Sequence, residues 1–146
     1  DQHDWFKQAR SGRDNPKREW YIWHDPVEGG PPNNYKAYFS PSAWEYDAAS
    51  GQYYFHSFAV EQPDLNWSNP ELRQAVYEMM RFWLDKGVNG FRMDVINMLA
   101  KKKGWPNADN PEHLDYMSNN PGLHEYPQGN RESGHLHGVD QADHPA

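Results

Sequence analysis

The sequence predicts an α/β fold, because a helical segment is followed by one glycine and then by a short apolar strand. Residues 70–84 carry apolar side chains at helical spacing, and Gly87 suits the end of a helix. Residues 88–96 then form an apolar run of strand length. A helix that leads into a strand in this way builds a parallel sheet, either an open sheet or a closed α/β barrel.

The start of the predicted helix is marked by three consecutive residues. Asn69 suits the N-cap, Pro70 suits the first helical position, and Glu71 lies at the positive end of the helix dipole. The apolar positions that recur along the helix are Leu72, Ala75, Val76, Met79, Met80, Trp83 and Leu84.

Arg92 and Asp94 stand two residues apart inside the apolar run. In a strand, residues i and i+2 point to the same face, so the two side chains project together. An adjacent guanidinium favours the ionised carboxylate, which is the state that a carboxylate nucleophile needs. On spacing alone, a structural ion pair at a strand end explains the two residues equally well.

The first part of the chain, residues 1–67, is predicted to be rich in loops. A short helix is expected near 15–22. A hairpin is expected around Gly51, because glycine suits the turn and the residues after it, 53–58, alternate between the two faces of a strand. The predicted short helix has a solvated face made of Lys17, Arg18 and Glu19.

Several ordered motifs resemble the α-amylase family of retaining glycoside hydrolases, and within it the bacterial oligo-1,6-glucosidases and α-glucosidases. The likeness extends from residue 1 to about residue 125. The motifs that carry it are 62–67 (QPDLNW), 69–73 (NPELR) and 90–97 (GFRMDVIN), with further matches at 33–39, 42–47 and 52–54.

This resemblance implies a partial (β/α)8 TIM barrel, centred on strand four, with the inserted loop-rich B domain. Residues 1–67 then correspond to the B-domain-like insertion after barrel strand three. Residues 68–126 correspond to helix three, strand four and the following loop, and residues 127–146 form an irregular tail. A complete barrel of this kind takes roughly 250 residues and this chain has 146, so we expect a fragment of a longer enzyme.

The resemblance also assigns roles around the Arg-x-Asp motif. Asp94 matches the catalytic nucleophile of the family, and Arg92 matches the arginine that orients it. Val95, directly after the nucleophile, matches a position where valine is typical of enzymes that prefer α-1,6 linkages. A β-branched side chain narrows a pocket, but the alternative is that Val95 only suits a strand.

Three more positions match residues that line the sugar pocket of the oligo-1,6-glucosidases: Phe39, Phe58 and Gln62. For Phe39 the alternative is ordinary packing within the subdomain. The case for Asp64 as a sugar-pocket residue is weaker, since an aspartate before a helix can simply brace the turn.

The expected function is that of an exo-acting retaining α-glucosidase acting on short α-1,6-linked glucosides, with α-1,4-linked ones as further candidates. No cofactor is expected, and the partner is an oligosaccharide substrate. The isolated chain is expected to be inactive, because the acid/base glutamate of the family follows strand five. Two alternatives remain: a transglycosylase or sucrose/trehalose isomerase of the same family, and a non-catalytic sugar-binding or interaction protein on the same scaffold.

Composition argues against nucleic-acid binding and against a membrane-spanning protein. The net charge of −7 and the absence of a basic stripe argue against nucleic acid. No run approaches the ~18 apolar residues of a membrane span, and with no cysteine present a bacterial cytoplasmic location is expected. No metal site is predicted. The tail 127–146 carries side chains that can bind metal ions, namely His135, His137, Asp140, Asp143 and His144. A frame-shifted terminus is a second explanation for the unusual composition of this tail.

Overall fold

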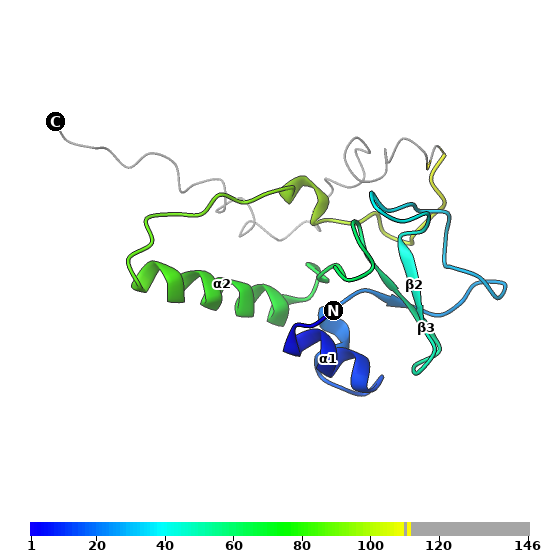
Figure 1. Ribbon diagram of the computed structural model, residues 1–146, viewed down its shortest axis with the longest axis horizontal. Coiled ribbons are helices and arrows are strands. Elements are labelled where there is room, and N and C mark those ends of the chain that lie inside the picture. The colour runs from blue at the N-terminus through cyan, green and yellow to red at the C-terminus, as the bar shows by residue number, and fades with distance from the viewer. Residues whose placement is uncertain (110, 112–146) are drawn as a thin grey trace.

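The computed structural model describes residues 1–109 and 111. A small antiparallel sheet lies on the right of Figure 1, and a long helix extends away from it to the left. The elements in chain order are α1 (Asp4–Ser11), η1 (Arg18–Trp20), β1 (Trp23–His24), β2 (Trp44–Asp47), β3 (Gln52–Phe55), α2 (Pro70–Asp85) and η2 (Ile96–Met98).

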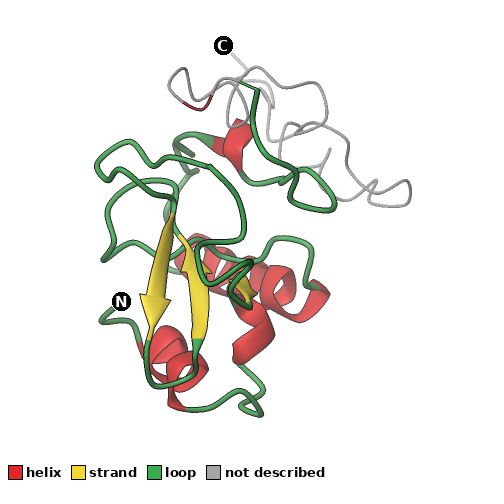
Figure 2. Ribbon diagram, turned by 90° about the vertical axis from the view of Figure 1, so that its right-hand side faces the viewer, coloured by secondary structure: helices red, strands yellow, loops and turns green. Residues whose placement is uncertain are grey.

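The three strands form one sheet in the order β1-β3-β2, with both pairs antiparallel. Figure 2 shows the two longer strands side by side. The predicted hairpin around Gly51 is confirmed, since β2 and β3 pair from Trp44↔Phe55 to Asp47↔Gln52. Gly51 takes a left-handed φ of 68°, which glycine adopts without steric cost.

Two apolar clusters make the core, and both are dominated by aromatic rings. One lies around Phe55 and Trp44, and it receives Trp105, whose ring centroid lies 5.2 Å from each of theirs. The other lies around Phe6 and Trp20 and includes Leu72 from α2. Residues after η2 therefore pack on the sheet, and the first turn of α2 packs on the N-terminal segment.

Arg18 corrects one expectation, because it is buried rather than part of a solvated helix face. Its guanidinium donates to the carbonyl of Ala9 at 2.9 Å and to Gln52 Oε1 at 2.6 Å, and it stacks 3.3 Å above the ring of Trp23. Burial lowers the pKa of Arg18 to about 10. The predicted short helix is a three-residue 3-10 turn that directs Arg18 inward, while helix α1 was not predicted.

Helix α2 confirms the predicted boundaries. Asn69 Oδ1 accepts hydrogen bonds from the backbone N–H groups of Glu71 at 2.9 Å and Leu72 at 3.2 Å, and Gly87 follows the helix with a φ of 93°. The apolar face is covered over the first two turns, where Leu72 is fully buried and Ala75 and Val76 are partly buried. Its later apolar residues, including Met79, Phe82 and Trp83, are exposed.

The strand expected over 88–96 is absent, which corrects the predicted parallel step. Residues 88–95 have no helix or strand, and η2 starts at Ile96. A strand needs a neighbour that takes its backbone hydrogen bonds, and within residues 1–109 and 111 no strand lies beside this segment. Among these residues no helix is both long and apolar enough to cross a membrane.

Candidate functional site

Arg92 and Asp94 contact each other, although the segment that carries them is not the predicted strand. Arg92 Nη2 lies 3.4 Å from Asp94 Oδ1, and the two side chains are 88% and 80% exposed. Val95, next in the chain, is also exposed and has a left-handed φ of 47°, which is rare for a β-branched residue. An ion pair in water is weak, so this exposed pair contributes little to the stability of the described segment.

Phe39 and Phe58 lie together with Tyr38 in a group of rings that we call the aromatic shelf. The ring centroids of Phe39 and Phe58 are 6.2 Å apart, and those of Tyr38 and Phe58 are 5.2 Å apart with the planes nearly parallel, at 13°. Phe39 is 75% exposed. Ordinary core packing therefore does not explain Phe39, and its ring is available to a ligand.

Gln62 closes the loop that carries Phe58. Its backbone N–H donates to the carbonyl of Ala59 at 2.9 Å, and its side-chain Oε1 accepts from the N–H of Ala59 at 3.2 Å. Gln62 is exposed and lies in the same short loop as Phe58. Among the described residues, no hydrogen bond, ion pair or ring contact joins Arg92 or Asp94 to the shelf.

Asp64 braces this loop and also ties it to the segment after Asp94. Its carboxylate accepts from the N–H of Ser57 at 2.8 Å and from Ser57 Oγ at 2.6 Å, and it pairs with Lys101 Nζ at 2.8 Å. Both charged side chains are largely buried. The turn-bracing interpretation of Asp64 is thus what the contacts show.

Lys101 and Tyr38 are the two residues of this region that sequence reasoning missed. Lys101 begins a run of three lysines, a pattern that indicates a solvated surface and gives no sign of a buried partner 37 residues away. Tyr38 precedes a matched phenylalanine, so the adjacent aromatic residues in positions 38 and 39 were the available signal.

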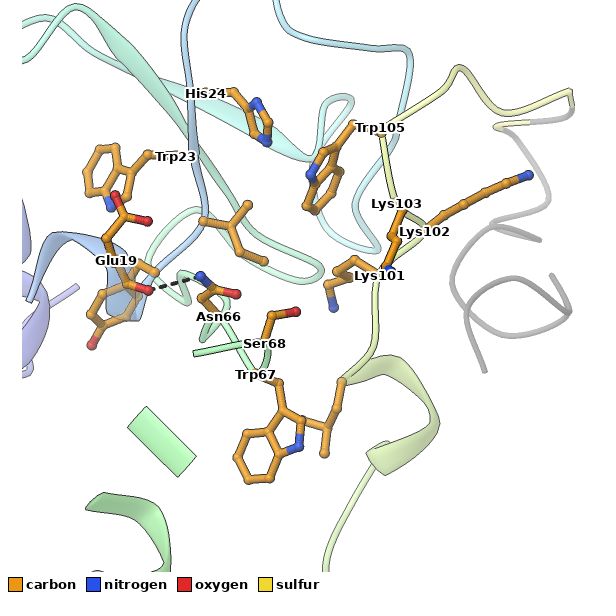
Figure 3. Close-up of a pocket in the computed structure, with 14 residues that line it drawn as sticks. Glu19, Trp23, His24, Asn66, Trp67, Ser68, Lys101, Lys102, Lys103 and Trp105 are labelled. Carbon is orange, nitrogen blue, oxygen red and sulfur yellow. Dashed lines mark hydrogen bonds between the residues drawn. The ribbon is translucent and has the colours of Figure 1, made fainter. Parts of the chain in front are cut away.

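A cavity of about 410 Å³ opens between β1 and the residues after η2 (Figure 3). His24 and Trp105 face each other across one end of it, with ring centroids 5.3 Å apart, and Trp67 lies at the other end. Burial lowers the pKa of His24, while the nearby Asp25 acts in the opposite direction. The net effect is a pKa below the ordinary value, which favours the neutral form of His24.

Within the part of the chain that the structure describes, no group of three His, Asp or Glu side chains is placed to hold a metal ion. The histidines and aspartates of the tail, considered above as metal ligands, lie outside the described residues, as does the whole 127–146 segment.

Residues 1–139 match the alpha amylase catalytic domain family. The chain is 51% identical over 134 residues to an oligo-1,6-glucosidase of Parageobacillus thermoglucosidasius, covering 88% of this chain and 24% of that protein. It is 48% identical over 141 residues to an α-glucosidase of Schizosaccharomyces pombe, again covering 88% of this chain and 24% of the relative. The chain thus spans about a quarter of the length of these relatives.

A solved structure gives the same relationship in three dimensions. An isomaltulose synthase mutant of Erwinia rhapontici NX5, in complex with D-glucose, superposes with a TM-score of 0.79 at 47% identity, covering 86% of this chain and 23% of that one. The helix, the hairpin and the Arg-x-Asp segment described above are therefore parts of a known domain, and the chain belongs to the alpha-amylase catalytic domain family.

Proposed function

We propose that the full-length protein containing this chain is an exo-acting, retaining α-glucosidase built on a (β/α)8 barrel. Its substrates are short α-1,6-linked glucosides, with α-1,4-linked glucosides as further candidates. The observation that carries the proposal is the 51% identity to an oligo-1,6-glucosidase across the segment that retains both Arg92 and Asp94. In this proposal residues 1–67 are the inserted B domain, and 68–126 belong to the barrel.

Asp94 is the proposed nucleophile. Its carboxylate attacks the anomeric carbon and forms a covalent glucosyl-enzyme, while Arg92 orients the carboxylate. A glutamic acid elsewhere in the catalytic domain protonates the leaving oxygen, and the same residue, now ionised, activates the water that releases glucose with retention. This chemistry needs no cofactor.

Phe39, Phe58 and Gln62 are the proposed sugar-binding residues. The contact between the two phenylalanine rings and the exposure of Phe39 support this role, because aromatic faces stack on the C–H faces of sugars. Gln62 contributes an amide beside them, which suits a sugar hydroxyl.

Substitution of the nucleophile tests the proposal directly. In the full-length protein, Asp94→Asn should lower kcat for isomaltose by more than about a hundredfold, because it removes several kcal/mol of transition-state stabilisation. The Kd for isomaltose, measured by calorimetry, should stay within a few-fold, since the amide keeps the shape of the carboxylate.

Asp85→Asn, at the exposed end of α2, is the matched control and should leave kcat unchanged. Retention of more than about one hundredth of kcat in the Asp94→Asn protein would contradict the nucleophile assignment, which is worth several kcal/mol.

A second candidate function is favoured by the likeness to the isomaltulose synthase. In a sucrose isomerase or transglycosylase the glucosyl-enzyme is captured by a sugar rather than by water. Product analysis with sucrose separates the two functions: glucose and fructose indicate hydrolysis, and a rearranged disaccharide indicates isomerisation. Binding without any turnover would indicate the non-catalytic alternative. The 146-residue chain alone is expected to show no turnover, because the proposed general acid belongs to another part of the catalytic domain.

A further inference from the structure

The loop 35–43 presents two consecutive aromatic residues to solvent. Tyr38 is 45% exposed and Phe39 is more exposed still, whereas Ala37 just before them is buried. The backbone that carries these exposed rings is held by hydrogen bonds. The N–H of Tyr38 donates to the carbonyl of Ser57 at 3.0 Å, and the N–H of Ala37 donates to the carbonyl of Ser40 at 3.2 Å. Both rings are thus held at the surface by the fold.

Tyr38 changes which surfaces of the aromatic shelf a ligand can reach. Its ring lies nearly parallel to that of Phe58 and so covers one face of it. Phe58 is partly buried and packs against the core cluster around Phe55. A ligand that approaches the shelf from solvent therefore meets Tyr38 and Phe39 before it meets Phe58.

We infer that Tyr38 is a substrate-binding residue whose ring stacks on a hexose ring of the α-glucoside. The inference rests on the proposed function and adds a residue to the site. An exposed aromatic face that is already fixed costs little entropy on binding, and sugars present C–H groups to such faces. Within the described residues the hydroxyl group of Tyr38 makes no hydrogen bond, so it can still pair with a sugar hydroxyl.

Three substitutions separate stacking on the sugar from simple cover for Phe58. In the full-length protein carrying Asp94→Asn to stop turnover, the Kd for isomaltose is measured by calorimetry. Tyr38→Ala and Tyr38→Leu should each raise this Kd about fivefold, the scale of one aromatic stack. Tyr38→Phe keeps the ring and should stay within about threefold.

Leucine is the informative variant, because it covers Phe58 with apolar volume but offers no ring face. It also keeps the test valid if the alanine variant folds poorly. The matched control is Tyr46→Ala, because Tyr46 is 49% exposed and its ring centroid lies 5.1 Å from that of Tyr53. Tyr46 pairs with Tyr53 near the turn of the hairpin, at the end of β3 that is farther along the chain from Ser57. This variant should leave the Kd unchanged.

The outcomes are distinct from those that judge the proposed function. The inference is overturned if the Tyr38→Leu protein has the same Kd as the Asp94→Asn parent while the Tyr38→Ala protein binds more weakly. It is also overturned if neither variant changes the Kd. Neither result bears on whether the full-length protein hydrolyses isomaltose. A full-length protein that binds isomaltose without hydrolysing it would overturn the proposed function, and the same Kd series would still support or overturn the role of Tyr38. If the full-length protein does not bind isomaltose, both are overturned.

Discussion

Asp47 and Asp94 show how differently one residue type is used in this chain. Asp94 is exposed, whereas Asp47 is fully buried at the end of β2. Asp47 accepts hydrogen bonds from Arg10 Nε at 2.9 Å and from the N–H of Ser50 at 3.1 Å. Burial raises the pKa of Asp47, but the hydrogen bonds from Ser50 and Arg10 outweigh it and bring the pKa below its ordinary value.

This arrangement makes the stability of the segment 1–67 dependent on pH. Because the pKa of Asp47 is lower in the folded protein than the unfolded value of 3.8, its ionised form stabilises the fold above that pH. The contribution is lost as the pH falls through the folded-state pKa. Asp47→Asn should therefore lower the free energy of unfolding more at about pH 7 than at about pH 3, as measured by urea denaturation. A difference that is the same at both pH values would contradict this role.

Val95 carries the prediction about linkage preference. In the full-length protein, Val95→Ala and Val95→Thr should raise the ratio of kcat/KM for maltose over isomaltose by roughly tenfold, the scale of a methyl-sized change in a pocket. Steady-state kinetics with the two disaccharides measures the ratio. If neither variant changes it, Val95 is a strand-forming residue with no part in specificity.

At the scale of the element, the β2–β3 hairpin depends on its turn. Gly51 has a φ of 68°, and a Cβ built on it would lie 3.6 Å from Arg13 Nη2. The space is sufficient, so the cost of a side chain here comes from the left-handed backbone, about 1–2 kcal/mol.

Gly51→Ala should accordingly lower the free energy of unfolding by about 1–2 kcal/mol. Gly12→Ala is the control, because Gly12 has an extended backbone with a φ of 179° and no atom within 4 Å of the added Cβ. Chemical denaturation of the two variants measures the difference. Equal stability of the two variants would show that the hairpin tolerates another turn geometry.

At the scale of the whole molecule, the apolar residues divide into a covered and an uncovered set. The sheet, α1 and the first turn of α2 share buried clusters. The second half of α2 and the segment 88–95 expose apolar side chains, among them Trp83, Phe91 and Val95. These are the positions that a barrel would bury, since its strands are covered on both faces.

Hydrogen exchange tests this division. In the full-length protein the amides of 88–96 should exchange slowly, because neighbouring barrel strands take their hydrogen bonds. In the 146-residue chain alone the same amides should exchange rapidly, with the amides of Gln52–Phe55 in β3 as the internal reference. Strong protection of 88–96 in a soluble monomer of the isolated chain would contradict the assignment of this segment to a shared barrel.

The features that the sequence determined by itself are those that depend on nearby residues. Asn69, Pro70 and Gly87 set the ends of α2, and Gly51 sets the hairpin turn, because caps and turns are made within a few residues.

Only the tertiary structure decided the features that join distant parts of the chain. Arg18 is buried because Ala9 and Gln52 lie beside it in space, and Lys101 is paired because Asp64 lies opposite. Residues 88–95 form no strand because no neighbouring strand lies beside them in the described chain, although their composition favours one. Hydrogen-bond partners and covering surfaces come from segments that local patterns do not specify, so burial and strand pairing could not be predicted from these residues alone.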